Sequence, residues 1–263
     1  IIVVDGNGIS LAKRALGRSG RKVPVFSWAH ITTEKVKGNN LFKLADHNLT
    51  ISKKISDQLE GMGIDKNKTT TIYNPVYPQK TTITFNQNNF LFIGRLRESH
   101  KKISTILHAL RNLDGDWALH IIGDGPNADD YQKQALELGI SNYVFFHGFI
   151  ENPWEYIKEN IGSVGSLLLS SRIEGFPMVL CEAMSYGIYC ISSDCETGPN
   201  EIIKEGVNGQ LFNVGDIQAL SAYAQEIINN NVNIDHDKIK NSINHLYIDN
   251  YMNNLINTLE KVK

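Results

Sequence analysis

Short apolar runs alternate along the whole chain with longer amphipathic stretches. Because a parallel strand is buried on both faces while its crossover helix is buried on one, this alternation is typical of βα units. The pattern predicts strands at residues 23–28, 48–51, 71–73, 90–93, 117–122, 144–146, 166–169, 189–192 and 209–212. It predicts helices at about residues 53–62, 103–113, 128–138 and 154–159, after Pro177, and through the tail. The fold class is therefore α/β with parallel sheets.

The first five residues, Ile1-Ile2-Val3-Val4-Asp5, form an apolar run with no turn before it. The run lacks the basic lead and the length of a signal peptide. It predicts a buried strand, and we expect the sequence to begin inside a domain. No apolar run elsewhere approaches the ~20 residues that a membrane-spanning helix needs.

A polar segment rich in Thr, Asn and Gln, residues 77–89, interrupts the pattern and is the best candidate for a linker. Residues 77–235 then hold enough strands and helices for a complete doubly wound domain. Residues 1–76 supply only about the last half of another such domain, and residues 236–263 are helical. We therefore expect two Rossmann-like domains, the first of them incomplete in this chain.

Charge is distributed unevenly along the chain, although the net charge is only −2. Residues 1–76 hold twelve Lys/Arg against six Asp/Glu, whereas the remainder holds fourteen against twenty-two. A basic first part favours an anionic partner, such as a phosphorylated lipid or a membrane surface. The alternative is a set of solvated surface lysines without a partner.

The three cysteines are Cys181, Cys190 and Cys195. No pair has the Cys-x-x-Cys spacing and no histidine pattern accompanies them, so the sequence predicts no zinc site. An odd and sparse count fits a reducing cytoplasm better than a disulfide framework.

The stretch richest in residues suited to catalysis or binding lies between Ser170 and Ala183. It follows a predicted buried strand and leads into a helix. Pro177 suits the first helical turn, so the N–H groups of Met178 and Val179 are free to bind an anion. Glu174 precedes this helix and Glu182 lies inside it, and carboxylates accept hydrogen bonds from sugar hydroxyls. The alternative makes each glutamate an ordinary helix-end or solvent-facing residue.

A second loop between a strand and a helix, residues 94–102, carries Arg95 and Lys101. Both cations can reach one diphosphate, Arg through its planar fork and Lys as a point charge. The alternative is a basic loop that pairs with acidic neighbours.

A third loop, residues 123–128, matches the loose dinucleotide fingerprint Gly-x-Gly-x-x-Gly/Ala through Gly123 and Gly125. Pro126 removes an N–H that would face a phosphate, and no acidic residue ends a strand at the required distance. The pattern therefore disfavours a nicotinamide enzyme. The glycines still suit a tight turn that lets a nucleotide approach the backbone.

One histidine, His30, stands just past the end of the strand predicted at residues 23–28. A lone histidine is more often structural than catalytic. It gains a chemical role if the two halves of the chain face each other across a cleft.

Taken together and in order, these stretches resemble the retaining GT-B glycosyltransferases of family 4, which include bacterial mannosyl- and glucosyltransferases. Glu174 and Glu182 match the family's Glu-x7-Glu motif. The other matching segments are residues 26–30, 45–52, 73–76, 92–101, 122–126, 183–187 and 206–209. Within this family, the chain resembles the lipopolysaccharide 1,6-galactosyltransferase group, through residues 26–30, 119–125, 174–178 and 192–199.

The resemblance implies a GT-B fold, in which two Rossmann-like domains face each other across a cleft. It implies catalytic roles for Glu174 on the donor sugar, for Arg95 and Lys101 on the leaving diphosphate, and for His30 near the reacting carbon or acceptor. It implies that the ribose is held by Glu182. The remaining donor-binding residues that it implies are Gly94, Gly123, Gly125, Gly175, Phe176, Pro177, Met178 and Val179.

The resemblance further implies a retaining transfer of a hexose, galactose in the closest-looking group, from a UDP-sugar to a lipopolysaccharide-core or other cell-surface glycan acceptor. It implies no metal and no cofactor, and we expect no nucleic-acid partner. The sparse cysteines favour a cytoplasmic enzyme, and the basic first part favours peripheral contact with the inner face of an anionic membrane. Two alternatives stay open. One is a glucosyl- or N-acetylhexosaminyl-transferase of the same fold for capsule or teichoic acid. The other is an inactive fragment that binds nucleotide sugars, because the family's glycine-rich acceptor loop has no counterpart here.

Overall fold

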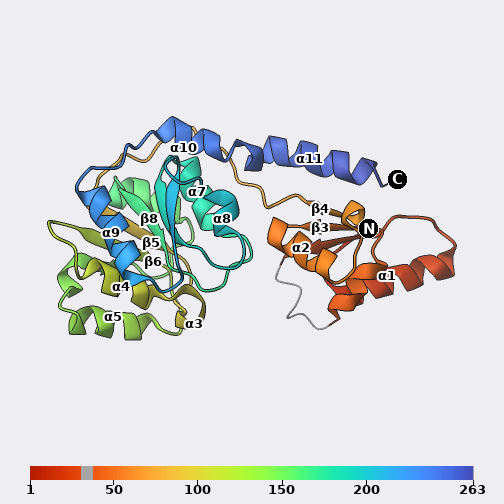
Figure 1. Ribbon diagram of the computed structural model, residues 1–263, viewed down its shortest axis with the longest axis horizontal. Coiled ribbons are helices and arrows are strands. Elements are labelled where there is room, and N and C mark those ends of the chain that lie inside the picture. The colour runs from red at the N-terminus through yellow and green to blue at the C-terminus, as the bar shows by residue number, and fades with distance from the viewer. Residues whose placement is uncertain (31–37, 263) are drawn as a thin grey trace. The chain divides into compact units, whose positions relative to one another are not determined.

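The computed structural model describes residues 1–30 and 38–262. The chain divides into two compact units, Ile1–Pro75 with His245–Lys263 and Val76–Asn244 (Figure 1). The boundaries predicted from the sequence lie after residues 76 and 235. No helix in the described part of the chain is long and apolar enough to cross a membrane.

The first unit is built on a parallel sheet with the order β1-β2-β3-β4. Its strands are β1 (Ile2–Val3), β2 (Phe26–Ala29), β3 (His47–Thr50) and β4 (Thr69–Thr71). Its helices are α1 (Gly6–Ser19), α2 (Lys53–Gly61) and α11 (Ile248–Glu260), with 3-10 turns at Asn39–Leu44 and Lys66–Lys68. The core joins Phe26, Leu49 and Ile72 from the sheet side to Tyr251 of α11. The C-terminal helix therefore completes the hydrophobic core of the first unit.

The prediction of a buried first strand is wrong. Strand β1 pairs with β2 along one side, and Ile2 and Val4 are 45% and 61% exposed. An apolar run signals a strand, but its burial depends on what lies on each side of it. Helix α1 has no counterpart among the predicted elements. It begins where the Asp5 carboxylate accepts a hydrogen bond from the Gly8 N–H.

The second unit is a doubly wound parallel sheet with the order β10-β9-β8-β5-β6-β7. Its strands are β5 (Asn89–Ile93), β6 (Ala118–Ile122), β7 (Val144–Phe146), β8 (Ser166–Leu169), β9 (Tyr189–Ser193) and β10 (Gly209–Phe212). Its helices are α3 (Glu98–Lys101), α4 (Ile103–Leu110), α5 (Ala128–Glu137), α6 (Pro153–Tyr156), α7 (Met178–Ser185), α8 (Pro199–Ile202), α9 (Ile217–Ile228) and α10 (His236–Ser242). Helix α4 packs against α5 and α9, whereas α7 packs against α8 and α10 (Figure 1).

The strand order of this sheet reverses between β5 and β8. From β5 the chain moves outward through β6 to β7, then returns to β8 on the other side of β5 and continues to β9 and β10. The loops that leave β5 and β8 are therefore neighbours at the carboxyl edge of the sheet, at its topological switch point. Ligands of open α/β sheets bind at such points.

Helix α10 belongs to the second unit, which moves the second boundary from the predicted residue 235 to Asn244. Ile239 is fully buried, and the Lys240 ammonium donates to the Thr81 carbonyl at 3.0 Å. His236 Nδ1 lies 2.8 Å from the Gly187 carbonyl oxygen. These contacts explain the difference, because a helical pattern does not show which core a helix joins.

Candidate active site

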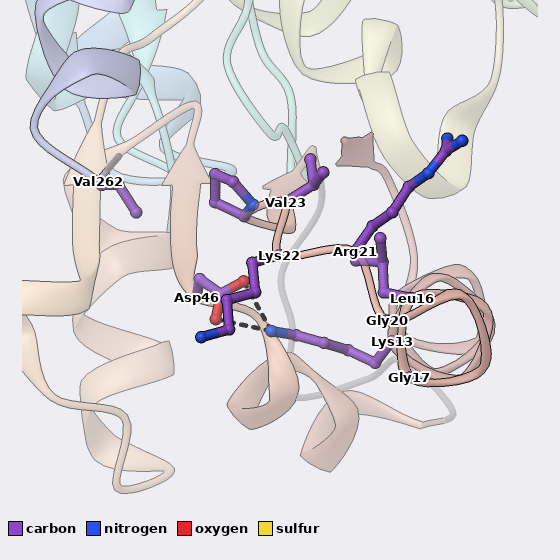
Figure 2. Close-up of a pocket in the computed structure, with 10 residues that line it drawn as sticks. Lys13, Leu16, Gly17, Gly20, Arg21, Lys22, Val23, Asp46 and Val262 are labelled. Atoms are coloured by element: carbon purple, nitrogen blue, oxygen red, sulfur yellow. Dashed lines mark hydrogen bonds and ion pairs between the residues drawn. The ribbon is translucent and has the colours of Figure 1, made fainter.

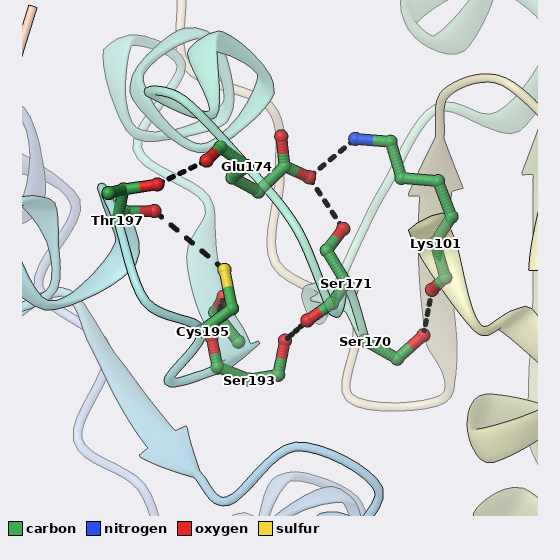
Figure 3. A network of polar contacts seen from close by, with 8 residues as sticks. Lys101, Ser170, Ser171, Glu174, Ser193, Cys195 and Thr197 are labelled. Atoms are coloured by element: carbon green, nitrogen blue, oxygen red, sulfur yellow. Dashed lines mark hydrogen bonds and ion pairs between the residues drawn. The ribbon is translucent and has the colours of Figure 1, made fainter. Parts of the chain in front are cut away.

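The two loops at the strand-order reversal are joined by an ion pair. Lys101 ends α3, which follows β5, and Glu174 lies in the loop that follows β8. The Lys101 Nζ and Glu174 Oε1 atoms are 2.5 Å apart, and the two side chains are only 20% and 11% exposed. The pair is shown in Figure 3. Two residues that the sequence offered as separate ligand contacts therefore form one unit at the strand-order reversal.

Hydroxyl groups from neighbouring loops hold Glu174 in place (Figure 3). The Ser171 hydroxyl donates to Glu174 Oε1 at 2.5 Å, and the Thr197 hydroxyl donates to the Glu174 carbonyl. The Ser193 hydroxyl donates to the Ser171 carbonyl at 2.6 Å, which ties the end of β9 to the end of β8. Oε2 of Glu174 is left as the oxygen that can accept from a ligand hydroxyl.

The loop that carries Lys101 is likewise held by the end of β8. The Ser170 hydroxyl donates to the carbonyls of Lys101 and Lys102 at 2.8 and 2.9 Å. The Arg172 N–H donates to the His100 carbonyl at 2.7 Å. These hydrogen bonds between the two loops fix the backbone at the strand-order reversal, so a ligand there meets a preorganised site.

Arg95 supplies a second cation on the β5 side. Its side chain is exposed, and within the described residues no carboxylate pairs with it. Arg95 lines a pocket of about 520 Å³ together with Gly94, Gly123, Phe149 and Ile150. Asp124 and Glu151 also line this pocket. The unpaired guanidinium in the lining is suited to a ligand group with negative charge.

The glycines at this edge of the sheet allow two loops to pack closely against each other. A Cβ on Gly123 would lie 2.0 Å from the Gly94 carbonyl oxygen, and one on Gly125 would lie 2.4 Å from that of Leu96. The Leu96 N–H donates to the Asp124 carbonyl at 2.9 Å. Gly94 and Gly123 line the pocket, whereas Gly125 is outside its lining. The fingerprint-like spacing thus has a packing reason in addition to any contact with a nucleotide.

The pocket is lined by the loop after β7 as well as by the loops after β5 and β6. The Gly123 N–H donates to the Gly148 carbonyl at 2.7 Å, and the His147 N–H donates to the Ile121 carbonyl at 2.9 Å. Phe149 is 77% exposed, which places an apolar ring at the opening of the pocket. The sequence analysis did not select Phe149 or Ile150, because single apolar residues in a loop carry no periodic signal.

The Gly175-Phe176-Pro177 stretch forms the entry to α7. Phe176 is 6% exposed, and both it and Pro177 lie against Gly198, whose Cβ position would be 2.5 Å from Pro177 Cδ. Pro177 precedes the helix, and no side chain in the described part of the chain caps it. Met178 and Val179 therefore begin α7 with backbone N–H groups at the helix N-terminus, as expected.

Glu182 lies in α7, one turn beyond the start of the helix. It is not a solvent-facing residue, because the Trp154 indole N–H donates to its Oε2 atom at 3.0 Å. Trp154 belongs to α6, which follows the pocket loop. The sequence analysis missed Trp154, since a lone aromatic residue gives no sign of its partner.

Residues 74–245 match the family described as "Glycosyl transferases group 1". The sequence is also 36% identical to the lipopolysaccharide 1,6-galactosyltransferase of Salmonella typhimurium, over 99% of this chain and 75% of that protein. The chain belongs to this family of glycosyl transferases. The predicted enzyme class, a glycosyltransferase, is confirmed.

Solved structures show the same fold for this glycosyl transferase. The apo form of the lipopolysaccharide outer core galactosyltransferase WaaB has a TM-score of 0.93 and 35% identity, over 99% of this chain and 74% of that one. Alr3699/HepE of Anabaena in complex with UDP has a TM-score of 0.87, over 99% and 78%. Its identity is 18%, so that likeness concerns the fold alone. The predicted GT-B fold with two Rossmann-like domains is confirmed.

The first unit of this glycosyl transferase holds His30 directly after β2. The residue as a whole is exposed, but its ring lies 5.1 Å from that of Trp28, centroid to centroid, and partial burial of the imidazole lowers its pKa below the ordinary value. A neutral imidazole at the carboxyl end of a parallel strand can accept a proton. The role that the resemblance implies for His30 stays a prediction.

The first unit of this glycosyl transferase also has a basic pocket of about 600 Å³ (Figure 2). Lys13, Arg21 and Lys22 contribute to its lining, together with apolar residues such as Val262. The Lys13 ammonium pairs with Asp46 at 2.6 Å. Arg21 and Lys22 are exposed and have no acidic partner within the described residues.

The described residues form no cluster with the ligands of a metal site. Among residues 1–30 and 38–262 no group of three or more His, Cys, Asp or Glu side chains gathers in the way a metal ion needs. Independence from a metal and a cofactor stays a prediction for this glycosyl transferase.

Proposed function

We propose that this chain transfers a hexose from a UDP-sugar to a lipopolysaccharide-core or other cell-surface glycan, with retention at the anomeric carbon. Galactose is the hexose we propose first. One observation carries the proposal. Lys101 and Glu174, joined at 2.5 Å, lie at the strand-order reversal. The unpaired Arg95 also follows β5 and lines a pocket at the same edge of the sheet. Two cations and a hydroxyl-binding carboxylate at this edge match a substrate that joins a diphosphate to a sugar.

The chemistry proposed for the cations is stabilisation of the leaving diphosphate. As the glycosidic bond breaks, negative charge grows on the diphosphate, and Arg95 and Lys101 lower the energy of that charge without a metal. The N–H groups at the start of α7 add a positive helix end to the same edge of the sheet. A same-face displacement, in which the leaving phosphate helps to deprotonate the acceptor, accounts for retention.

The chemistry proposed for the carboxylates is recognition of hydroxyls. Glu174 binds the donor sugar through the oxygen that its contacts with Lys101 and Ser171 leave available. Glu182 binds the ribose, and the pocket between β5, β6 and Phe149 takes the base. The relatives support this proposal by their names, and the 36% identity with a galactosyltransferase favours galactose over glucose or an N-acetylhexosamine.

Calorimetric titration with UDP, UDP-galactose, UDP-glucose, GDP-mannose and NAD tests the donor assignment. We expect UDP species to bind and Glu182→Ala to weaken them by about tenfold or more, the usual effect of losing a charged hydrogen-bond partner. Tightest binding of UDP-glucose would favour the glucosyltransferase alternative. Binding of NAD alone would overturn the proposal, and binding without turnover on glycan acceptors would favour the inactive fragment.

Contact with an anionic membrane is proposed for the basic pocket of the first unit. Arg21 and Lys22 present unpaired cations (Figure 2), and each such residue contributes roughly 1 kcal/mol near an anionic surface. We expect co-sedimentation with vesicles that contain anionic lipid, a loss of most of that binding in Arg21→Glu/Lys22→Glu, and weakening by salt. Equal binding to neutral and anionic vesicles would contradict this part of the proposal.

A further inference from the structure

A single side chain links the pocket loop to Glu182. Trp154 is the second residue of α6, immediately after Pro153, which lines the pocket. Its indole N–H donates to Glu182 Oε2 at 3.0 Å. An indole has one N–H donor and no acceptor, so this hydrogen bond satisfies the polar group of the Trp154 ring.

The indole is itself held in position by α7. Trp154 stacks on Tyr186 with ring centroids 5.2 Å apart and an interplanar angle of 28°. Tyr186 follows the last residue of α7 and is 6% exposed. Glu182 lies in the last turns of α7 and Tyr186 is the residue that caps its C-terminal end, four positions later, so the two side chains hold the ring at two points.

Helix α6 is anchored at its other end as well. The Tyr156 hydroxyl lies 3.0 Å from His147 Nδ1, and His147 Nε2 lies 3.0 Å from His120 Nδ1. Burial and the neighbouring His147 lower the pKa of His120 to about 4, so this imidazole is neutral near neutral pH. The helix that carries Trp154 is therefore fixed to β6 and to the loop after β7.

These contacts set the direction in which the Glu182 carboxylate points. One oxygen is occupied by the indole, while Oε1 has no hydrogen-bond partner within the described residues. A carboxylate that rotates freely averages over many orientations, whereas one clamped through a single oxygen presents the other in a defined direction.

We propose that Trp154 is a positioning residue for ribose recognition: by holding Oε2 of Glu182, it directs Oε1 toward a ribose hydroxyl of the nucleotide. The inference rests on the proposed function of Glu182 and deepens it. Trp154 does not touch the ligand in this scheme. It determines whether the carboxylate discriminates a nucleotide with ribose hydroxyls from one without them.

The test compares UDP with 2′,3′-dideoxyuridine diphosphate, by calorimetry, on the wild-type chain and on Trp154→Phe. The phenyl ring keeps stacking on Tyr186 and removes the N–H. We expect the wild type to prefer UDP by about tenfold. In Trp154→Phe we expect the affinity for UDP to fall to nearly that for the dideoxy compound, which itself stays almost unchanged.

A matched control is available at Trp117. It stacks on Tyr143 with ring centroids 5.1 Å apart and an angle of 27°, closely similar to the Trp154 pair. Trp117→Phe removes the same atoms elsewhere in the unit, and we expect it to keep the preference for UDP. Loss of the preference in both variants would overturn the inference, because the effect would then be general loosening.

Failure of the role of Glu182 and failure of the role of Trp154 give different results. A wild-type chain that binds UDP and the dideoxy compound equally refutes the proposed role of Glu182. A wild type that discriminates, with Trp154→Phe discriminating equally, overturns the inference and leaves Glu182 in place.

A measurement on the wild type covers the case in which Trp154→Phe does not fold. The Trp154 indole N–H resonance can be assigned by elimination with Trp28→Phe and Trp117→Phe. We expect UDP to shift it more than the dideoxy compound does. Equal shifts would overturn the inference.

Discussion

Replacement of Lys101 by methionine is expected to lower kcat by about a hundredfold to a thousandfold, the usual cost of losing one preorganised group that stabilises transition-state charge. Lys101 Nζ lies 2.5 Å from Glu174 Oε1 in a largely buried pair. Its removal withdraws a cation from the leaving diphosphate and frees the carboxylate that is proposed to bind the donor sugar. The measurement is steady-state turnover of the UDP-sugar on a glycan acceptor.

The matched control is Lys133→Met. Lys133 pairs with Glu137 at 3.7 Å on the surface of α5, where the two side chains are 76% and 63% exposed. Such a pair contributes at most about 1 kcal/mol to stability, and we expect turnover to stay unchanged. The double variant Lys101→Met/Glu174→Gln should lose much less than the product of its single effects, because the two residues act as a unit. Full turnover in Lys101→Met would refute the role of the cation.

Replacement of Gly123 by alanine is expected to lower the free energy of unfolding of the second unit by about 3 kcal/mol or more. The added Cβ would lie 2.0 Å from the oxygen and 2.9 Å from the carbon of the Gly94 carbonyl, and the Gly123 φ of +138° is unfavourable for alanine. The clash is with backbone, which cannot move without separating β5 from β6. Urea unfolding measures the loss, and UDP titration should show that binding is lost with it.

Gly139→Ala separates the clash from the backbone conformation. Gly139 has a φ of +74°, and its added Cβ would meet nothing within 4 Å. We expect a loss of only about 1–2 kcal/mol, the cost of a left-handed conformation for a residue with a side chain. If both variants lost the same free energy, close packing of the two loops would not be the reason for Gly123.

The elements of the second unit could be predicted from local pattern. The strands predicted at residues 144–146, 166–169 and 209–212 coincide with β7, β8 and β10, because short segments of strand length that alternate with longer helical patterns indicate the strands of βα units. The elements of the first unit were harder to predict. Helix α1 begins at Gly6 and includes Gly8 and Gly17, and glycine weakens the helical signal.

The candidate site could be predicted only in part. Lys101 and Glu174 were found because each follows a strand and carries a charge suited to a nucleotide sugar. Their ion pair was not foreseen, because a separation of 73 positions along the chain gives no measure of their distance in space. Trp154 was missed for the same reason, since its partner Glu182 lies 28 residues away.

By itself, the sequence determined the succession of strand, loop and helix, and with it the residues that stand at the carboxyl ends of strands. Hydrophobic periodicity and turn chemistry act over a few residues, so they are legible in one chain. The tertiary structure alone decided that β8 lies beside β5, that Lys101 therefore meets Glu174, and that Trp154 clamps Glu182. Strand order depends on pairings between distant segments and on the side of the sheet to which each helix crosses, and these are settled when the core packs.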